Sequence, residues 1–458
     1  MKDPLLKAGK KSPPTAGLNK SLSILGKFSL STLAVTAILF ILRMVKNIVF
    51  TRLLGPSGRG IYGLLTTIPG LIISFGNLGF GLGSVYLLSK KKYALHKVLG
   101  NAFLYLLLQG AILALFGVVL LSFKGIVKAD YYIIEKFSFL VLAAIPFLLA
   151  QHTGGTLLLG IKDIHFYNIL QILFSAFPML LMVLLWLITK DALFSAMVAW
   201  TVTIALVAVI SFIQLYKKAG KRVGISISYI KEAFSFGLRG NISMFANEVV
   251  RRIDILFIAY FLGATQVGYY AVSVSVAEIL LALPDAIALP FLPIRMGMDS
   301  SEAASFSPFV IKYVLLIMVF VCGITALAGK AIIFILYGKN FFPALVPMLC
   351  LLPGILALSL YQFLKADIYS MNRPGFISIV SLITMISNLV LNYLMIPPYG
   401  INGAAISSSI SYAVSTLILF AFFLRKTGLS WDAVLLVKKK DVHFIMDTIV
   451  PQIKNRMR

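Results

Sequence analysis

Long apolar segments, separated by short polar or basic stretches, recur along the whole 458-residue chain. Each segment holds about 20 or more mainly apolar residues, which is enough for a helix to cross a hydrocarbon core about 30 Å thick. The pattern predicts an all-α polytopic membrane protein with twelve transmembrane helices. The predicted spans are residues 27–50, 61–88, 98–122, 136–159, 166–188, 193–216, 235–262, 267–292, 309–335, 344–370, 374–396 and 401–424.

A short phrase after the first span has a counterpart in the second half of the chain. Residues 54–62 read LGPSGRGIY and residues 262–270 read LGATQVGYY, at an offset of 208 residues. The coinciding residues are Arg43 with Arg251, Leu54 with Leu262, Gly55 with Gly263, Gly60 with Gly268 and Tyr62 with Tyr270. The repeat predicts two related six-helix lobes around a central cavity, a common plan for transporters, with an arginine in the first helix of each lobe.

Polar and basic segments bound these lobes. Residues 217–234 contain five Lys or Arg and separate six predicted spans from six. The first 24 residues are polar and lysine-rich, a composition typical of disorder. The predicted organisation is a disordered cytoplasmic tail at 1–24, an N-lobe at 25–216, a basic cytoplasmic linker at 217–234, a C-lobe at 235–424 and a basic cytoplasmic tail at 425–458.

The composition excludes a soluble enzyme, because 60% of the residues are hydrophobic and only 12% are charged, against about a quarter charged in soluble domains. The net charge of +25 follows from Lys and Arg in alternate loops: residues 425–458 carry eight, whereas residues 263–266 and 397–400 carry none. Cytoplasmic loops are enriched in Lys and Arg, so both termini are predicted to be cytoplasmic. Nucleic-acid binding is disfavoured, since the sequence has no soluble domain or recognition motif for it.

Several charged residues lie inside the predicted spans, where each costs about 2.5–3.5 kcal/mol on insertion scales. Such residues usually face a cavity or a partner. The span 235–262 is the extreme case. At 100° per residue, one broad face of this helix carries Arg239, Ser243, Asn247, Arg251 and Asp254. Glu248 and Arg252 are four residues apart on another face, and we expect them to form a structural pair.

The other candidates lie on the first, second and eighth spans. The predicted substrate-binding residues are Arg43, Lys46, Asn47, Asn77, Arg239, Asn247 and Arg251. The predicted coupling or gating residues are Asp254, Glu278 and Asp285. We expect Asp254 to hold Arg251 when cargo is absent. The alternative interpretation is that these charges pair between helices and fix the register of the bundle. Lys365 and Asp367 are interpreted as reaching the inner interface rather than forming a site.

An excess of cations on faces in both halves predicts a basic cavity and therefore an anionic cargo. The planar donor fork of arginine suits phosphate and pyrophosphate oxygens better than the point charge of lysine. The short loops contain no paired carboxylates and no His/Asp constellation that would support catalysis. We therefore predict a transporter rather than an enzyme, with no metal site.

Four sequence stretches carry a family resemblance. They are RLLGPSGRGIYGLL at 52–65, GNLGFGLGSVYLLSKK at 76–91, LGATQVGYYAVSVSVAEILLALP at 262–284 and NLVLNYLMIPPYGINGAAIS at 388–407. Taken in this order across nearly the whole chain, they resemble the motifs of Wzx-type flippases for lipid-linked oligosaccharides. That family belongs to the multidrug/oligosaccharidyl-lipid/polysaccharide exporter superfamily.

The resemblance implies a two-lobed transporter in a bacterial inner membrane, which turns an undecaprenyl-pyrophosphate-linked sugar repeat unit to the outer face for O-antigen or other surface polysaccharide. It implies alternating access and a coupling ion, H⁺ or Na⁺, but no cofactor. The family's cavity cations correspond to Arg43, Lys46 and Arg251. The implied partners are the lipid-linked anionic glycan, membrane lipids and other polysaccharide-assembly proteins.

Other functions remain open. A drug or organic-cation antiporter of the same superfamily would need an acidic cavity, which the basic helix faces disfavour. A lipid II flippase usually has fourteen spans, and residues 425–458 have no room for two more. A membrane-embedded glycan polymerase would need large catalytic loops, and a purely structural scaffold would not need Arg251 near the middle of a span.

Overall fold

The computed structural model describes residues 30–122 and 131–436. The predicted tail at 1–24 and residues 437–458 of the predicted basic tail lie outside this part. All regular structure in the described residues is helical. The elements are α2 (Leu30–Gly76), α3 (Phe80–Ser89), α4 (Leu95–Ser122), α5 (Tyr131–Gly160), α6 (Ile164–Thr189), α7 (Ala192–Lys218), α8 (Ile227–Leu262), α9 (Ala264–Met296), α10 (Ser300–Tyr337), the 3₁₀ helix η2 (Lys339–Ala344), α11 (Leu345–Ser370), α12 (Pro374–Thr427) and α13 (Trp431–Leu435).

Glycines with positive φ break the longest helical stretches. Gly55 breaks α2 (φ 65°, ψ −179°) and Gly400 breaks α12 (φ 61°, ψ −143°), while Gly263 separates α8 from α9 (φ 88°, ψ 173°). Backbone of this kind is open almost only to glycine, which has no Cβ. Gly55 and Gly263 are equivalent in the sequence repeat, so the repeated phrase turns the chain at the same place in each half.

Eight helices in the described part are long and apolar enough to cross a membrane, or nine if the bent pair Val35–Gly76 and Phe80–Ser89 is one span. The sequence pattern predicted twelve. The numbers differ because α2 and α12 each run through a glycine break that separates two predicted spans. The 54 residues of α12 would extend about 80 Å at 1.5 Å per residue if they formed one straight helix. In addition, α8 contains seven charged residues.

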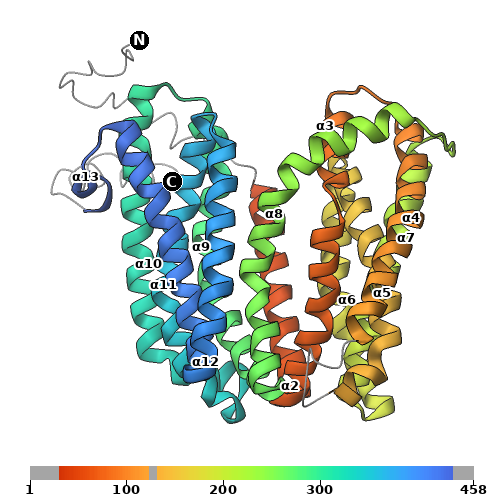
Figure 1. Ribbon diagram of the computed structural model, residues 1–458, viewed down its shortest axis with the longest axis horizontal. Coiled ribbons are helices and arrows are strands. Elements are labelled where there is room, and N and C mark those ends of the chain that lie inside the picture. The colour runs from red at the N-terminus through yellow and green to blue at the C-terminus, as the bar shows by residue number, and fades with distance from the viewer. Residues whose placement is uncertain (1–29, 123–130, 437–458) are drawn as a thin grey trace, which may run out of the picture.

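Figure 1 shows two helical bundles, with α2 and α8 running between them. One bundle contains α3 to α7, and the other contains α9 to α13. α2 packs against α5 and α6 on one side and against α9 on the other. α8 begins on α3 and continues along α12. We call the end of the molecule that carries the α2 break the Gly55 end and the opposite end the α3 end.

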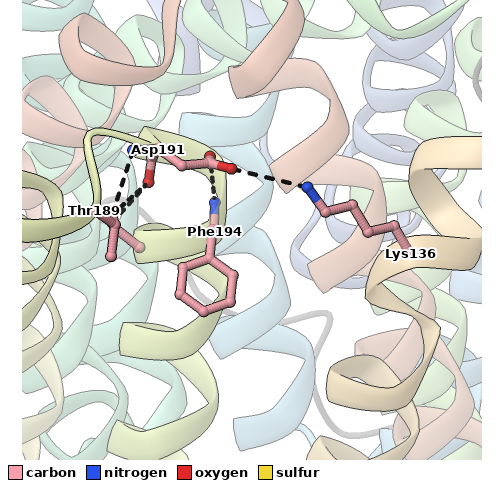
Figure 2. Close-up of polar contacts among 5 residues, drawn as sticks. Lys136, Thr189, Asp191 and Phe194 are labelled. Atoms are coloured by element: carbon pink, nitrogen blue, oxygen red, sulfur yellow. Dashed lines mark hydrogen bonds and ion pairs between the residues drawn. The ribbon is translucent and has the colours of Figure 1, made fainter.

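Polar contacts fix the turn between α6 and α7 (Figure 2). An Asp191 carboxylate oxygen accepts a hydrogen bond from the Phe194 backbone N–H (2.9 Å) and thereby caps α7. The Asp191 N–H donates to the Thr189 hydroxyl (3.3 Å), and Lys136 of α5 lies 3.9 Å from the Asp191 carboxylate. These contacts hold α6 relative to α5 and α7, and α6 in turn lies against α2.

The two copies of the repeated phrase pack directly against each other. Gly60 contacts the backbone of Ala264, and Gly268 contacts the backbone of Pro56. Pro56 and Ala264 are themselves equivalent in the repeat, so the contact is pseudo-symmetric. A methyl group on either glycine would overlap a backbone carbonyl oxygen, which cannot rotate away as a side chain could. We call this the glycine contact, and it is where the two halves meet at the Gly55 end.

The glycine contact predicts a difference between two substitutions in the same helix. Gly60→Ala should destabilise the protein by about 1–3 kcal/mol, the usual cost of overpacking. A Cβ at Gly70 would meet nothing within 4 Å, so Gly70→Ala should be neutral or slightly stabilising. Thermal unfolding of the purified proteins in one detergent measures both effects. Equal unfolding midpoints for the two variants would contradict the proposed tightness of the contact.

Candidate functional site

A cavity of about 950 Å³ lies between α2 and α9. Its wall also includes Arg252 of α8 and Tyr337 at the end of α10. The polar residues among its lining are Thr36, Arg43, Lys46, Asn47, Arg59, Tyr62, Arg252, Ser275, Glu278, Asp285 and Tyr337. Along α2 the lining extends from Tyr62, close to the glycine contact, back to Thr36. The cavity therefore adjoins the glycine contact, where the two halves meet.

The α2 side of the cavity is cationic, and α6 holds two of its cations in place. Arg43 and Lys46 are three residues apart and share a helix face. The Arg43 guanidinium donates to the Gln171 side-chain oxygen (3.1 Å). The Lys46 ammonium lies 5.4 Å from the centroid of the Phe174 ring, within cation–π range. None of these contacts neutralises a charge, so both cations keep their attraction for an anion.

Arg59 is a third cation on the α2 side, and sequence reasoning missed it. Its Nε donates to the Thr51 hydroxyl (3.1 Å), and its guanidinium lies 5.9 Å from the Tyr62 ring. It lies between the predicted spans 27–50 and 61–88, so the span pattern places it in a loop. One signal could have found it, because its counterpart at the repeat offset is the apolar Val267. A charge that one half has and the other lacks is a candidate for function.

The α9 side carries the acidic residues of the lining. Glu278 and Asp285 are seven residues apart and therefore lie on one face of α9. Glu278 lies 3.8 Å from Arg252, and Asp285 accepts a hydrogen bond from the Gln362 amide (2.8 Å). The cavity thus has four cations, Arg43, Lys46, Arg59 and Arg252, against two carboxylates.

Two polar contacts join the halves beside the glycine contact. Asn47 of α2 donates to the Ser275 hydroxyl of α9 (3.2 Å). Arg52 of α2 donates to the carbonyl oxygens of Ile335 (2.5 Å) and Leu336 (2.9 Å), near the C-terminal end of α10. The last carbonyls of a helix lack intrahelical partners and attract cations. Both contacts join the two halves toward the Gly55 end of the cavity.

The structure places Arg252, rather than Arg251, against the cavity that contains Arg43. Glu248 lies between the two arginines in space: it is 3.0 Å from Arg251 and 3.6 Å from Arg252. The expected Glu248–Arg252 pair is therefore present, with Arg251 as a second partner of the same carboxylate. Arg251 keeps 60% of its side chain exposed. Equivalence in the repeat did not fix the rotation of α8, and one residue along a helix changes the facing direction by about 100°.

The expectation that Asp254 holds Arg251 is wrong for this state of the protein. Asp254 is buried, and its carboxylate accepts hydrogen bonds from the Tyr270 hydroxyl (2.5 Å) and the Ile255 N–H (2.8 Å). Arg251 is instead paired with Glu248. Tyr270 belongs to the repeated phrase that begins α9, so this contact ties α8 to α9 near their junction at Gly263.

Two more predicted substrate residues, Asn77 and Asn247, do not line the cavity. Asn77 is buried at the break between α2 and α3, where its side chain contacts His152 (3.3 Å) and its carbonyl accepts from Tyr105 (3.0 Å). Asn247 donates to the Ser243 carbonyl within α8 (2.8 Å). Arg239 lies in α8, and its side chain is outside the described part.

Asp367 does not reach the interface, contrary to the sequence interpretation. It is fully buried, 2.5 Å from Arg295 of α9, and accepts a hydrogen bond from the Ser307 hydroxyl of α10 (2.7 Å). A cation and a hydroxyl on neighbouring helices make this burial possible. Lys365, two residues earlier, is only partly buried and lies 5.9 Å from the Tyr361 ring.

This buried pair gives a stability prediction that separates structural charges from cavity charges. Arg295→Met should destabilise the protein by about 3–5 kcal/mol, because it leaves the Asp367 carboxylate buried without a cation. The double variant Arg295→Met, Asp367→Leu removes both charges and should recover most of that loss. Denaturation in detergent micelles measures the series. Equal stability of the Arg295→Met protein and the unchanged protein would contradict the structural role of the pair.

Comparison with known proteins adds a family and a fold. Residues 49–346 match the family model described as "Polysaccharide biosynthesis protein". The chain is 24% identical over 199 residues to the "Probable low-salt glycan biosynthesis flippase Agl15" of Haloferax volcanii. That match spans 42% of this chain and 42% of that relative.

Solved structures of transporters share the fold. An inward-facing multidrug resistance MATE family transporter of the MOP superfamily matches with a TM-score of 0.74 at 13% identity, over 90% of this chain and 98% of that one. The lipid II flippase MurJ, in an inward closed conformation, matches with a TM-score of 0.71 at 15% identity, over 86% and 87% of the two chains. The protein is thus a multi-pass membrane protein with a MATE/MurJ-like fold.

Proposed function

Because the chain belongs to the polysaccharide biosynthesis protein family, we propose that it is a flippase for a glycan carried on undecaprenyl pyrophosphate. The name of the Haloferax volcanii relative, "Probable low-salt glycan biosynthesis flippase Agl15", supports this class of cargo. The cargo would move from the cytoplasmic to the outer face of a bacterial inner membrane for surface polysaccharide assembly. Its other partners would be membrane lipids and the polysaccharide-assembly proteins that act before and after it.

The observation that carries the proposal is the cationic α2 side of the cavity. Arg43, Lys46 and Arg59 line one wall, and their contacts on α2 and α6 are neutral groups. A pyrophosphate offers several oxygens that guanidinium forks can bind in pairs. At an effective dielectric near 20, one such contact at about 4 Å is worth up to about 4 kcal/mol before desolvation is subtracted. We assign Arg43, Lys46, Arg59 and Asn47 to the cargo site.

We further propose that the chain crosses the membrane twelve times, in an N-lobe at 25–216 and a C-lobe at 235–424 joined by the linker 217–234. The glycine breaks at Gly55 and Gly400 support two crossings each for α2 and α12. The basic residues of the linker and of 425–458 favour a cytoplasmic α3 end, with both termini on that side. The Gly55 end would then face outward.

Alternating access in this arrangement would begin from the described state. The glycine contact, the Arg52 contacts and the Asn47–Ser275 hydrogen bond block exit at the Gly55 end. Cargo would enter from the α3 end, and breaking these contacts would release it outward. Glu278 and Asp285 face the cations across the cavity, and together with buried Asp254 they are the candidates for coupling to H⁺ or Na⁺. The same two cavity acids favour organic-cation antiport as a second candidate.

Sidedness of the lipid-linked glycan in cells tests the proposal. Deletion of the gene should trap the repeat unit on the cytoplasmic leaflet, and the unchanged gene should restore export. Arg43→Gln should lower export at least about tenfold, since tenfold requires the loss of only about 1.4 kcal/mol. Arg43→Lys should restore it in part, because an ammonium keeps the charge but not the fork.

The matched control is Arg222→Gln, which removes the same charge from an exposed position in the linker. It should export normally. Full export by Arg43→Gln at equal protein levels would place the cargo site elsewhere. Unchanged glycan sidedness after deletion, in a strain without another exporter, would refute the flippase assignment. Export of an organic cation that depends on Glu278 would favour the antiporter instead.

A further inference from the structure

A second, smaller cavity of about 540 Å³ lies at the α3 end, remote from the cargo site. It sits between the end of α3 and the first turns of α8. Its lining residues are Tyr86, Leu87, Lys90 and Lys92 on one side and Lys231, Glu232, Ser235 and Phe236 on the other. The proposed flippase cycle does not use these residues.

The charge of this cavity is incompletely balanced. The Lys92 ammonium donates to both oxygens of the Glu232 carboxylate (2.8 Å each). The hydrogen bond from Lys92 lowers the pKa of Glu232, which keeps this pair ionised and mutually satisfied. Lys90 and Lys231 are exposed, and neither has an ion-pair partner among the described residues. Two ammonium groups, one on each side of the cavity, are therefore available to an anion.

An aromatic surface adjoins the two lysines. The rings of Tyr86 and Phe236 stack with centroids 4.0 Å apart and planes 8° apart. Each residue is 41% exposed although it is large and apolar. On a membrane protein, exposed aromatic rings beside lysines are typical of the interface between headgroups and acyl chains. This surface therefore favours a ligand with an apolar part next to its anionic part.

The cavity is also preformed. α3 and α8 approach so closely that a Cβ on Gly79 or Gly83 would overlap backbone atoms of Gly237 or Ala233. The Tyr229 hydroxyl donates to the Ser84 hydroxyl (2.6 Å) in the buried part of the same contact. A ligand would not have to order these helices, so little binding energy would be lost to rearrangement.

We propose that this cavity binds the phosphate of an anionic phospholipid headgroup between Lys90 and Lys231, with an acyl chain along Tyr86 and Phe236. Basic pockets between helices on the cytoplasmic side are a known way to hold such headgroups. The proposal rests on the orientation given above, in which the α3 end is cytoplasmic. The lipid would link α3 to the start of α8, the helix that connects the two bundles.

Native mass spectrometry of the purified full chain tests the site. The probes are phosphatidylglycerol, phosphatidylcholine and inorganic phosphate. We expect retention of phosphatidylglycerol in preference to phosphatidylcholine, and at least a tenfold loss of affinity in Lys90→Gln, Lys231→Gln. The matched control Lys217→Gln, Lys221→Gln removes two exposed lysines near the same end and should bind normally. Each single variant should show an intermediate affinity.

Three results would overturn the site: equal retention of both lipids, equal losses in the two double variants, or inorganic phosphate binding as tightly as phosphatidylglycerol. The last result would indicate a site for free anions. Lipid retention does not depend on cargo. A failed flippase assignment would leave this result intact, and a failed lipid site would leave glycan export by the unchanged protein intact.

Discussion

The glycine contact between α2 and α9 is the constraint on which the rest of the structure depends. Backbone meets backbone at Gly60 with Ala264 and at Gly268 with Pro56, so the two halves approach more closely than any side chain would allow. The same phrase supplies Gly55 and Gly263, whose positive φ angles turn the chain just before the contact. Each copy of the phrase therefore supplies both a chain turn and one side of the glycine contact. These features lie at the Gly55 end of the cavity.

In the cavity next to this contact, cationic and acidic side chains lie on different helices. Its cations on α2 rest on Gln171, Phe174, Thr51 and the Tyr62 ring, all neutral groups. Its carboxylates lie on α9, and Glu278 is partly engaged by Arg252. An anion that entered would meet positive charge whose attraction is not already satisfied. Arg295 and Asp367, by contrast, are both buried and pair with each other, which is the pattern of a structural pair.

Features that depend on hydrophobic periodicity and on the positions of glycines could be predicted from the sequence. The motifs at 52–65 and 76–91 indicated the family, which the match over residues 49–346 confirms. The sequence also singled out Arg43, Lys46, Asn47, Glu278 and Asp285 as polar or charged residues inside predicted spans, and all five line the cavity. The rotation of α8 about its axis and the pairing of its charged side chains could not be predicted from the sequence. The repeat aligned Arg251 with Arg43, but the rotation of α8 places Arg252 against the cavity, and Glu248 pairs with both arginines. Arg59 was missed because its helix begins immediately after Gly55 rather than at residue 61.

The most direct test of the central claim uses purified protein in proteoliposomes that contain a glycan linked to undecaprenyl pyrophosphate. An impermeant glycan-modifying enzyme reports how much of the lipid faces outward. The account predicts that the protein equilibrates the glycan between leaflets, and that the Arg43→Gln protein, inserted to the same level, does not. Equal transfer by both proteins, or no transfer above protein-free vesicles under an imposed H⁺ or Na⁺ gradient, would contradict it.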